Sequence, residues 1–194
     1  MRNYYKKLTD ADYSIIPFAY IGDSRAIVSK HINHRLSVMQ KFIGKDIRGL
    51  HTLDVGGPNG FGERLGIKDT TLPYDLNFVV RAPSYDYDMI FCLETIEHIM
   101  NPLMVMIELR KLLKPGGVMY LSTPRPFWGF LQGGQHFTEY KPRPFERMCV
   151  FAGYEVVRRK KFCLWDWDFF FWGVRPMFRV LFHRNYLYEL RVKD

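Results

Sequence analysis

The 194-residue sequence predicts an α/β protein built on a mainly parallel β-sheet. Two observations support this prediction. Short apolar segments typical of buried strands alternate along the chain with amphipathic, helix-like segments. A glycine-rich turn, "DVGGPNG" at 54–60, separates the first strand-like segment from a helix-like one. In open parallel sheets, ligands bind at such turns, beyond the carboxyl ends of the strands.

The first half of the chain contains four predicted elements. A helix is expected over 26–43, where apolar residues recur at helical spacing and Gly44 gives a stop signal. A short strand, "LHTLDV" at 50–55, comes next, and "GFGERLG" at 60–66 begins a short helix. We expect a second strand over 70–75.

The second half alternates more regularly. The segment "YDMIFCL" at 87–93 is a strong buried strand. The helix after it, over 101–113, has Asn101 as a suitable N-cap and Pro102 at its first position. The remaining predicted elements are a strand "VMYLSTP" at 118–124, a helix over 142–152, and strands at 154–162 and 185–192.

Composition limits the location and the partners. A net charge of +8 and a pI of about 9.4 favour an anionic partner, such as a phosphorylated small molecule, nucleic acid or an acidic membrane surface. Three scattered cysteines without a CxxC pair fit a reducing compartment. Neither a signal peptide nor a spanning segment is evident. We therefore expect a single cytoplasmic domain over 1–194.

The glycine turn allows the backbone to approach a ligand closely, because glycine has no Cβ and reaches positive φ. The turn lacks the Gly-Lys-Ser/Thr ending of a Walker A loop, and Pro58 stands where the dinucleotide fingerprint needs glycine. A purely structural turn is therefore the alternative. Asp75 lies 21 residues after Asp54, at the end of the second predicted strand. It is placed either to bind a ribose diol or to cap a turn.

These motifs together resemble the class I S-adenosylmethionine-dependent methyltransferases of the small-molecule type, over roughly 50–160. The segment "LDVGGPNGFG" resembles the family's glycine motif, and 87–124 resembles its fourth strand, the helix after it and its fifth strand. The resemblance implies a Rossmann-like sheet with an antiparallel last strand, and S-adenosyl-L-methionine as cofactor. The segment between Asp75 and Asp88 is short, so we expect the third-strand region to be shortened.

The resemblance also implies roles for matched positions. Asp54 would help to position the methionine amino group, and Asp75 would hold the ribose hydroxyls. The glycines Gly56, Gly57 and Gly60 would line the methionine part and the ribose, although Pro58 changes the path of the loop. The residues that would border the methyl-transfer site are Cys92, Leu93 and Glu94.

Two histidines are candidates for the base that methyl transfer to a hydroxyl requires. His136 lies in the polar loop "LQGGQHFTEY" at 131–140, at the same edge of the sheet as the glycine turn. Its alternative role is to pin that loop. His98, after the fourth-strand segment, is the second candidate, with a structural hydrogen bond as its alternative. Glu94 and Glu97 alone are too few for a catechol-type metal site, so we expect no metal.

The segment 162–184 is the most unusual part of the sequence. Its aromatic residues lie between the last two strands with arginines beside them, and Gly173 and Pro176 prevent one long helix. Three roles remain open: extra core with a lid, a homodimer face, or a peripheral membrane contact that would make the protein membrane-associated. Residues 1–45 are expected to cover the cofactor and acceptor site.

The predicted function is therefore S-adenosylmethionine-dependent O-methylation of a small-molecule, glycan or lipid-linked acceptor. One alternative is an RNA-binding methyltransferase, since basic and aromatic residues also bind nucleic acid. No recognised nucleic-acid module supports that alternative. The other is a degenerate, non-catalytic scaffold that keeps the fold, as the altered glycine loop suggests.

Overall fold

The computed structural model describes residues 25–56, 60–72, 76–126 and 136–193. Its elements in chain order are α1 Arg25–Ile43, β1 Thr52–Asp54, α2 Gly60–Leu65, β2 Asp69–Thr70, β3 Tyr87–Leu93, the 3-10 helix η1 Ile96–His98, α3 Pro102–Lys111, β4 Leu113–Pro124, α4 Pro142–Phe151, β5 Tyr154–Phe162, the 3-10 helix η2 Trp167–Trp172, α5 Val174–Phe182 and β6 Asn185–Val192.

The strands form one six-stranded sheet in the order β2-β1-β3-β4-β6-β5. The first four strands of that order run parallel to one another, whereas β6 is antiparallel to both β4 and β5. This arrangement confirms the mainly parallel, Rossmann-like α/β fold with an antiparallel last strand. The carboxyl ends of β1, β3 and β4 consequently meet at one edge of the sheet.

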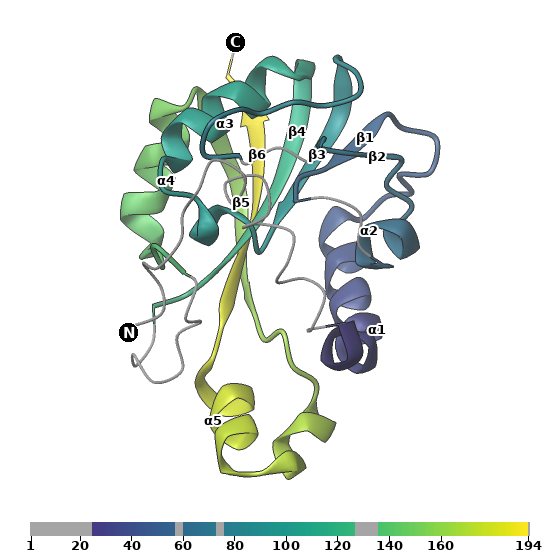
Figure 1. Ribbon diagram of the computed structural model, residues 1–194, viewed down its shortest axis with the longest axis vertical. Helices are drawn as coiled ribbons and strands as arrows, with labels where there is room; N and C mark the ends of the chain where they lie inside the picture. The colour runs from purple at the N-terminus through teal and green to yellow at the C-terminus, as the bar shows by residue number, and fades with distance from the viewer. Residues whose placement is uncertain (1–24, 57–59, 73–75, 127–135, 194) are drawn as a thin grey trace, which may run out of the picture.

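Helices cover both faces of the sheet. In Figure 1, α3 and α4 lie over one face, and α1 and α2 lie over the other. Alternate residues of one strand therefore enter different cores. Ile90 packs into the core under α3 and α4, whereas its neighbour Phe91 packs into the core under α1. Tyr188 and Leu187 of β6 divide in the same way.

The third-strand region is shortened, as predicted. The second strand is only the two residues of β2, Asp69–Thr70, and Asp75 lies outside the described residues. From residue 76 to residue 86 the chain forms turns and irregular structure and no strand. Leu76 anchors this connection by packing into the main core with 3% of its surface exposed. In the described part of the chain between β2 and β3, no further strand or helix is therefore formed.

The start of α3 confirms the predicted cap, because the Asn101 side chain accepts a hydrogen bond from the Met104 N–H at 3.3 Å. The strand after α3 begins earlier than expected. The sequence predicts a strand over 118–124, but β4 already pairs at Leu113 with Tyr87, and the register shifts before Met89. The prolyl-glycyl segment lies between these two pairings, and Gly116 there has a φ of 70°.

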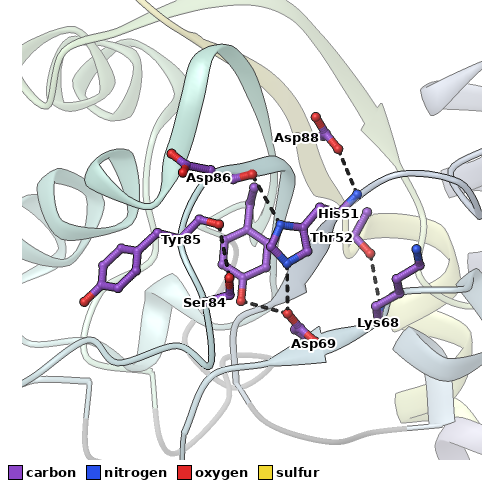
Figure 2. Close-up of polar contacts among 9 residues, drawn as sticks. His51, Thr52, Lys68, Asp69, Ser84, Tyr85, Asp86 and Asp88 are labelled. Atoms are coloured by element: carbon purple, nitrogen blue, oxygen red, sulfur yellow. Dashed lines mark hydrogen bonds and ion pairs between the residues drawn. The ribbon is translucent and has the colours of Figure 1, made fainter.

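A polar network joins the amino ends of the parallel strands (Figure 2). The Asp69 carboxylate lies 3.2 Å from His51 Nε2 and accepts a 2.9 Å hydrogen bond from the Tyr87 hydroxyl. Asp88 accepts hydrogen bonds from the His51 backbone N–H at 2.8 Å and from Lys114 Nζ at 2.7 Å. These contacts lie at the edge opposite the glycine turn, so they hold β1, β2 and β3 together rather than contribute to a site there.

The segment 162–184 is the end of a long β5–β6 hairpin that projects beyond the rest of the sheet and carries η2 and α5 at its tip (Figure 1). The tip has a small aromatic cluster of its own, in which the Trp165 and Phe169 rings stack at 4.4 Å. Other apolar side chains of the tip remain exposed, among them Trp167, Phe171, Trp172 and Val174. Among the described helices, none is both long and apolar enough to cross a bilayer.

Candidate functional site

The glycine turn begins where β1 ends at the carboxyl edge of the sheet. Asp54, the last residue of β1, is buried with 4% of its surface exposed. Gly56 has a φ of 121°, and its N–H donates to Thr71 Oγ1 at 3.2 Å. A Cβ on Gly56 would lie 3.1 Å from Thr95 Oγ1, whose hydroxyl donates to the Val55 carbonyl at 3.0 Å. The backbone at Gly56 thus excludes a side chain through both conformation and space.

A second glycine of the motif is fixed by Asp54 itself. A Cβ on Gly62, in α2, would lie 2.5 Å from Asp54 Oδ2. The Asp54 carboxylate therefore lies directly against the first turns of α2. Gly60 is the first residue of that helix, while Gly57 and Asp75 lie outside the described residues. The glycines at 56 and 62 thus allow close packing of the turn against Thr95 and Asp54. The turn lies at the carboxyl end of β1, where nucleotide-type cofactors bind in open parallel sheets.

The end of β3 separates the three residues predicted there. Cys92 is fully buried in the core under α3 and α4, where burial raises the pKa of its thiol well above the ordinary value. Only its backbone can therefore face a ligand. Leu93 points to the opposite face and lines a hollow beneath α1. Glu94, with a φ of 53°, accepts hydrogen bonds from the Ser122 hydroxyl at 2.6 Å and the Asn185 amide at 2.5 Å.

A basic residue of α1 completes this hollow. Arg35 lies along its wall, and the guanidinium carbon is 5.3 Å from the centroid of the Phe61 ring. Burial lowers the pKa of Arg35, and the nearby charges of Glu94 and Glu97 oppose that shift. The other lining residues are Val38, Met39, Leu93, Ser122, Phe162, Leu164 and Leu187. The hollow therefore combines an apolar wall with one cation, Arg35, and with Ser122, whose hydroxyl donates to Glu94.

The two candidate histidines lie against each other. The rings of His98 and His136 are 5.0 Å apart between centroids, and the Glu97 carbonyl accepts a hydrogen bond from the Phe137 N–H at 2.8 Å. This backbone contact brings the loop after β4 to the carboxyl end of β3. His136 Nδ1 lies 2.9 Å from Glu139 Oε1, and both side chains are largely buried, 16% and 6% exposed.

Glu97 is the most unusual ionisable group at this edge. It is 1% exposed, and its Oε2 has no hydrogen-bond partner among the residues that the structure describes. Burial first, and then the charge of Glu94, raise the pKa of Glu97 well above the ordinary value. The ligand atoms of Glu97, His98 and His136 all lie within 4.8 Å of one another, a spacing at which they could hold a metal ion.

Sequence reasoning missed five residues of this arrangement. Arg35 stands in a helix whose apolar periodicity indicates packing and says nothing about a partly buried cation. Glu139 follows His136 by three residues, and that spacing was the one local signal available. Ser122, Thr95 and Asn185 act through contacts between elements distant in the chain, which spacing cannot reveal.

This chain is similar in sequence to a known protein family and to several characterised proteins. A methyltransferase-domain family model matches residues 25–170. A ubiquinone biosynthesis O-methyltransferase of Marinobacter nauticus is 29% identical over 113 residues, which cover 52% of this chain and 48% of that protein. The protein of the same name from Vibrio cholerae is 36% identical over 58 residues, covering 30% and 24%. The chain thus spans about half, or less, of the length of the curated relatives that it matches.

Solved structures share the fold at low identity. A protein solved in complex with the Haloferax volcanii Trm112 methyltransferase activator has a TM-score of 0.66 and 16% identity, covering 91% of this chain and 97% of that one. The 1,6-didemethyltoxoflavin-N1-methyltransferase of Burkholderia thailandensis, solved with S-adenosylhomocysteine, has a TM-score of 0.60 and 11% identity, covering 97% and 92%. The family match over most of the sequence and the common fold show that the chain belongs to the class I S-adenosylmethionine-dependent methyltransferases.

Proposed function

We propose that this protein binds S-adenosyl-L-methionine at the glycine turn and transfers its methyl group to a hydroxyl of a small-molecule, glycan or lipid-linked acceptor. The bound cofactor would supply an electrophilic methyl group. Gly56, Gly57 and Gly60 would admit its methionine part and ribose, and Asp54 would position the amino group. Asp75 would accept the ribose hydroxyls, while Leu93, Glu94 and the backbone of Cys92 would border the reacting groups. The position of the glycine turn at the carboxyl end of β1, with the buried carboxylate of Asp54 beside it, supports this placement.

The pairing of His136 with Glu139 carries the proposal of O-methylation. A carboxylate at 2.9 Å from Nδ1 favours the tautomer with the proton on Nδ1, which leaves the Nε2 lone pair available. Nε2 can then accept the proton of an acceptor hydroxyl as its oxygen attacks the methyl carbon, and the Glu139 carboxylate stabilises the resulting imidazolium. His98, packed against the His136 ring, would hold this base in position. The curated relatives named as O-methyltransferases agree with an oxygen acceptor.

We propose that the transfer needs no metal ion. Glu97, His98 and His136 are close enough to share one, but burial and the charge of Glu94 raise the pKa of Glu97 and so favour its neutral form. A neutral carboxyl is a poor cation ligand. Methyl transfer also needs no Lewis acid when a base stands beside the nucleophile, because the sulfonium is already a strong electrophile.

We also propose that the hairpin tip contacts an anionic membrane surface. Phe171 is 82% exposed and Trp167 68%, at the end of a projection that extends away from the sheet (Figure 1). Arg175 is exposed beside them, and the whole chain has a net charge of +8. Aromatic side chains enter the bilayer interface while cationic side chains meet anionic headgroups. A lipid-linked acceptor would be presented to the site from such a surface.

An assay with defined probes tests the proposed reaction. The protein would be incubated with S-adenosylmethionine and, separately, with panels of catechols, simple glycosides and RNA, and products would be identified by mass spectrometry. O-methylated products that His136→Ala no longer forms would support the proposal. Products methylated only on nitrogen would contradict it. Failure to bind the cofactor at all would favour the non-catalytic scaffold, and methylation of RNA alone would favour the RNA-directed alternative.

A further inference from the structure

A basic groove with about 600 Å³ of space lies where β4 ends beside the start of α4. Its walls come from the segment after β4, the first turns of α4, the middle of β5 and the start of β6. The basic side chains that line it are Arg125, Lys141, Arg143, Arg147 and Arg159, and the remaining lining residues are Pro126, Pro142, Pro144 and Tyr186. A groove of this size accommodates a small molecule rather than a single ion.

The positive charge of this groove is poorly neutralised. Glu146 pairs with Arg159 at 2.5 Å. Within the described ranges of the chain, no acidic side chain forms an ion pair with Arg125, Lys141, Arg143 or Arg147. The sequence also contains no aspartate or glutamate from residue 123 to residue 138. The groove therefore has several cations in excess, which attract an anionic ligand.

The basic residues at the start of α4 interact unfavourably with the dipole of that helix. The positive end of a helix dipole favours acidic residues in the first turn and disfavours basic ones. The first turn of α4 has no acidic residue, and Lys141 at its N-cap makes no side-chain capping bond. Pro142 and Pro144 lack N–H groups, so side chains rather than backbone amides would hold an anion here. A bound anion would relieve the repulsion that this arrangement creates.

One wall of the groove is already held in place. The Arg159 guanidinium lies 5.3 Å from the centroid of the Tyr186 ring and is anchored by Glu146. Such an arginine loses little freedom when it binds, and its planar fork matches the oxygens of a phosphate. Of the other cations, Arg143 and Arg147 stand on α4, with Lys141 at its N-cap, and Arg125 follows the end of β4. A ligand in the groove would therefore meet cations from three elements, since Arg159 belongs to β5. This distribution suits a diphosphate better than a single carboxylate.

The groove lies at the same edge of the sheet as the proposed reaction. Lys141 follows Glu139, the partner of His136, by two residues. The Arg125 N–H donates to the Arg184 carbonyl at 2.8 Å, next to Asn185, whose amide holds Glu94. We propose that the groove binds the phosphate or diphosphate group of a phosphorylated acceptor and thereby presents its hydroxyl part to His136. This inference rests on the proposed methyl transfer.

Binding of inorganic pyrophosphate tests the groove without knowledge of the acceptor. Calorimetric titrations would compare the wild-type protein with the variant Arg143→Gln/Arg147→Gln. The matched control, Lys45→Gln/Lys193→Gln, also removes two exposed charges but lies away from the groove. We expect the groove variant to lose about tenfold or more in affinity and the control to change little. Undetectable pyrophosphate binding, or equal losses in both variants, would overturn the proposal.

Two further measurements distinguish a lipid phosphate from a soluble one, and the proposed groove from the proposed methyl transfer. Vesicles of phosphatidylcholine with and without phosphatidic acid would be compared: retention that needs phosphatidic acid and that pyrophosphate releases supports a lipid phosphate. Pyrophosphate binding without such retention supports a soluble acceptor. Single-stranded RNA that binds the wild type but is not displaced by pyrophosphate would overturn the proposal. S-adenosylhomocysteine binding would be measured on the same samples. If only the methyl-transfer assignment is wrong, the protein will bind pyrophosphate but not S-adenosylhomocysteine.

Discussion

The carboxylate of Asp54 occupies the space that any side chain at residue 62 would need, because a Cβ on Gly62 would lie 2.5 Å from Asp54 Oδ2. The contact joins the end of β1 to α2 and fixes the position of a buried acid at the edge of the sheet where the cofactor is proposed to bind. The glycine at 62 therefore serves the geometry of Asp54, independently of any ligand that the turn admits.

The first prediction concerns this contact. Gly62→Ala should push Asp54 or α2 out of position, destabilise the fold by about 1–3 kcal/mol and weaken S-adenosylhomocysteine binding. Gly49→Ala is the matched control, since a Cβ there meets nothing within 4 Å. Chemical denaturation and calorimetric titration measure the two effects. Equal stability and affinity in both variants would remove Asp54 from the cofactor site.

A second prediction separates the base from its partner. His136→Ala should lower turnover by about 10²-fold or more and leave cofactor affinity unchanged, because the proton acceptor is lost. Glu139→Gln should lower turnover less, since the ring keeps its Nε2 but loses the charge that favours the correct tautomer. Prior treatment with a chelator should change neither the turnover nor the cofactor affinity of the wild-type protein. Full activity of His136→Ala would exclude it as the base and leave His98 as the candidate.

The third prediction is a pH dependence of stability. The hydrogen bond from Lys114 first, and that from the His51 N–H next, lower the pKa of Asp88 below its ordinary value of 3.8. A carboxyl whose pKa is depressed by folding stabilises the fold above its unfolded pKa, and this contribution is lost as the pH falls through the folded value. The stability difference between wild type and Asp88→Asn should therefore be largest near neutrality and shrink below about pH 4.

Urea denaturation across that range measures the difference. Asp168→Asn, a change at an exposed aspartate on the hairpin tip, is the control and should give a small difference at every pH. A difference for Asp88→Asn that stays constant down to pH 3 would show that the carboxylate charge is unimportant in the network of Figure 2.

The fourth prediction concerns the hairpin tip. Vesicles containing phosphatidylglycerol should retain the wild-type protein at low salt, and added salt should release it, because the attraction is partly electrostatic. Trp167→Ser/Phe171→Ser should weaken retention without loss of stability, since both side chains are largely exposed. Retention of this variant equal to that of the wild type would exclude the hairpin tip as the membrane contact. A concentration-dependent dimer that the wild type forms and the variant does not would instead assign the tip to self-association.

Local patterns predicted most of the fold because they report local physics. The strands β3, β5 and β6 have the bounds expected from their apolar and turn residues, and α3 begins at the expected cap. The start of β4 was missed because the pairing of Leu113 with Tyr87 crosses a break in the register. The residue pattern of a single strand does not reveal a bulge, because a bulge is defined by how that strand pairs with its neighbour.

The site was less predictable for the same reason. The sequence identified Asp54 and Gly56 because they belong to one contiguous glycine motif. It also identified His98 and His136, whose rings the structure brings together. The charge environment, by contrast, depends on tertiary contacts: Arg35 comes from α1, and Asn185 comes from the other end of the chain. Burial of Glu97 likewise became visible only once the sheet and its helices were assembled.

The most direct test of the central claim is a calorimetric titration of S-adenosylmethionine and S-adenosylhomocysteine into the wild-type protein, Gly56→Val and the control Gly49→Val. Gly56 combines a φ of 121° with Thr95 Oγ1 at 3.1 Å from its missing Cβ, whereas a Cβ at Gly49 meets nothing within 4 Å. We predict binding on the order of micromolar in the wild type and in the control, and loss of binding in Gly56→Val. Absent binding in folded wild-type protein, or equal binding in all three, would contradict the assignment of the glycine turn to the cofactor.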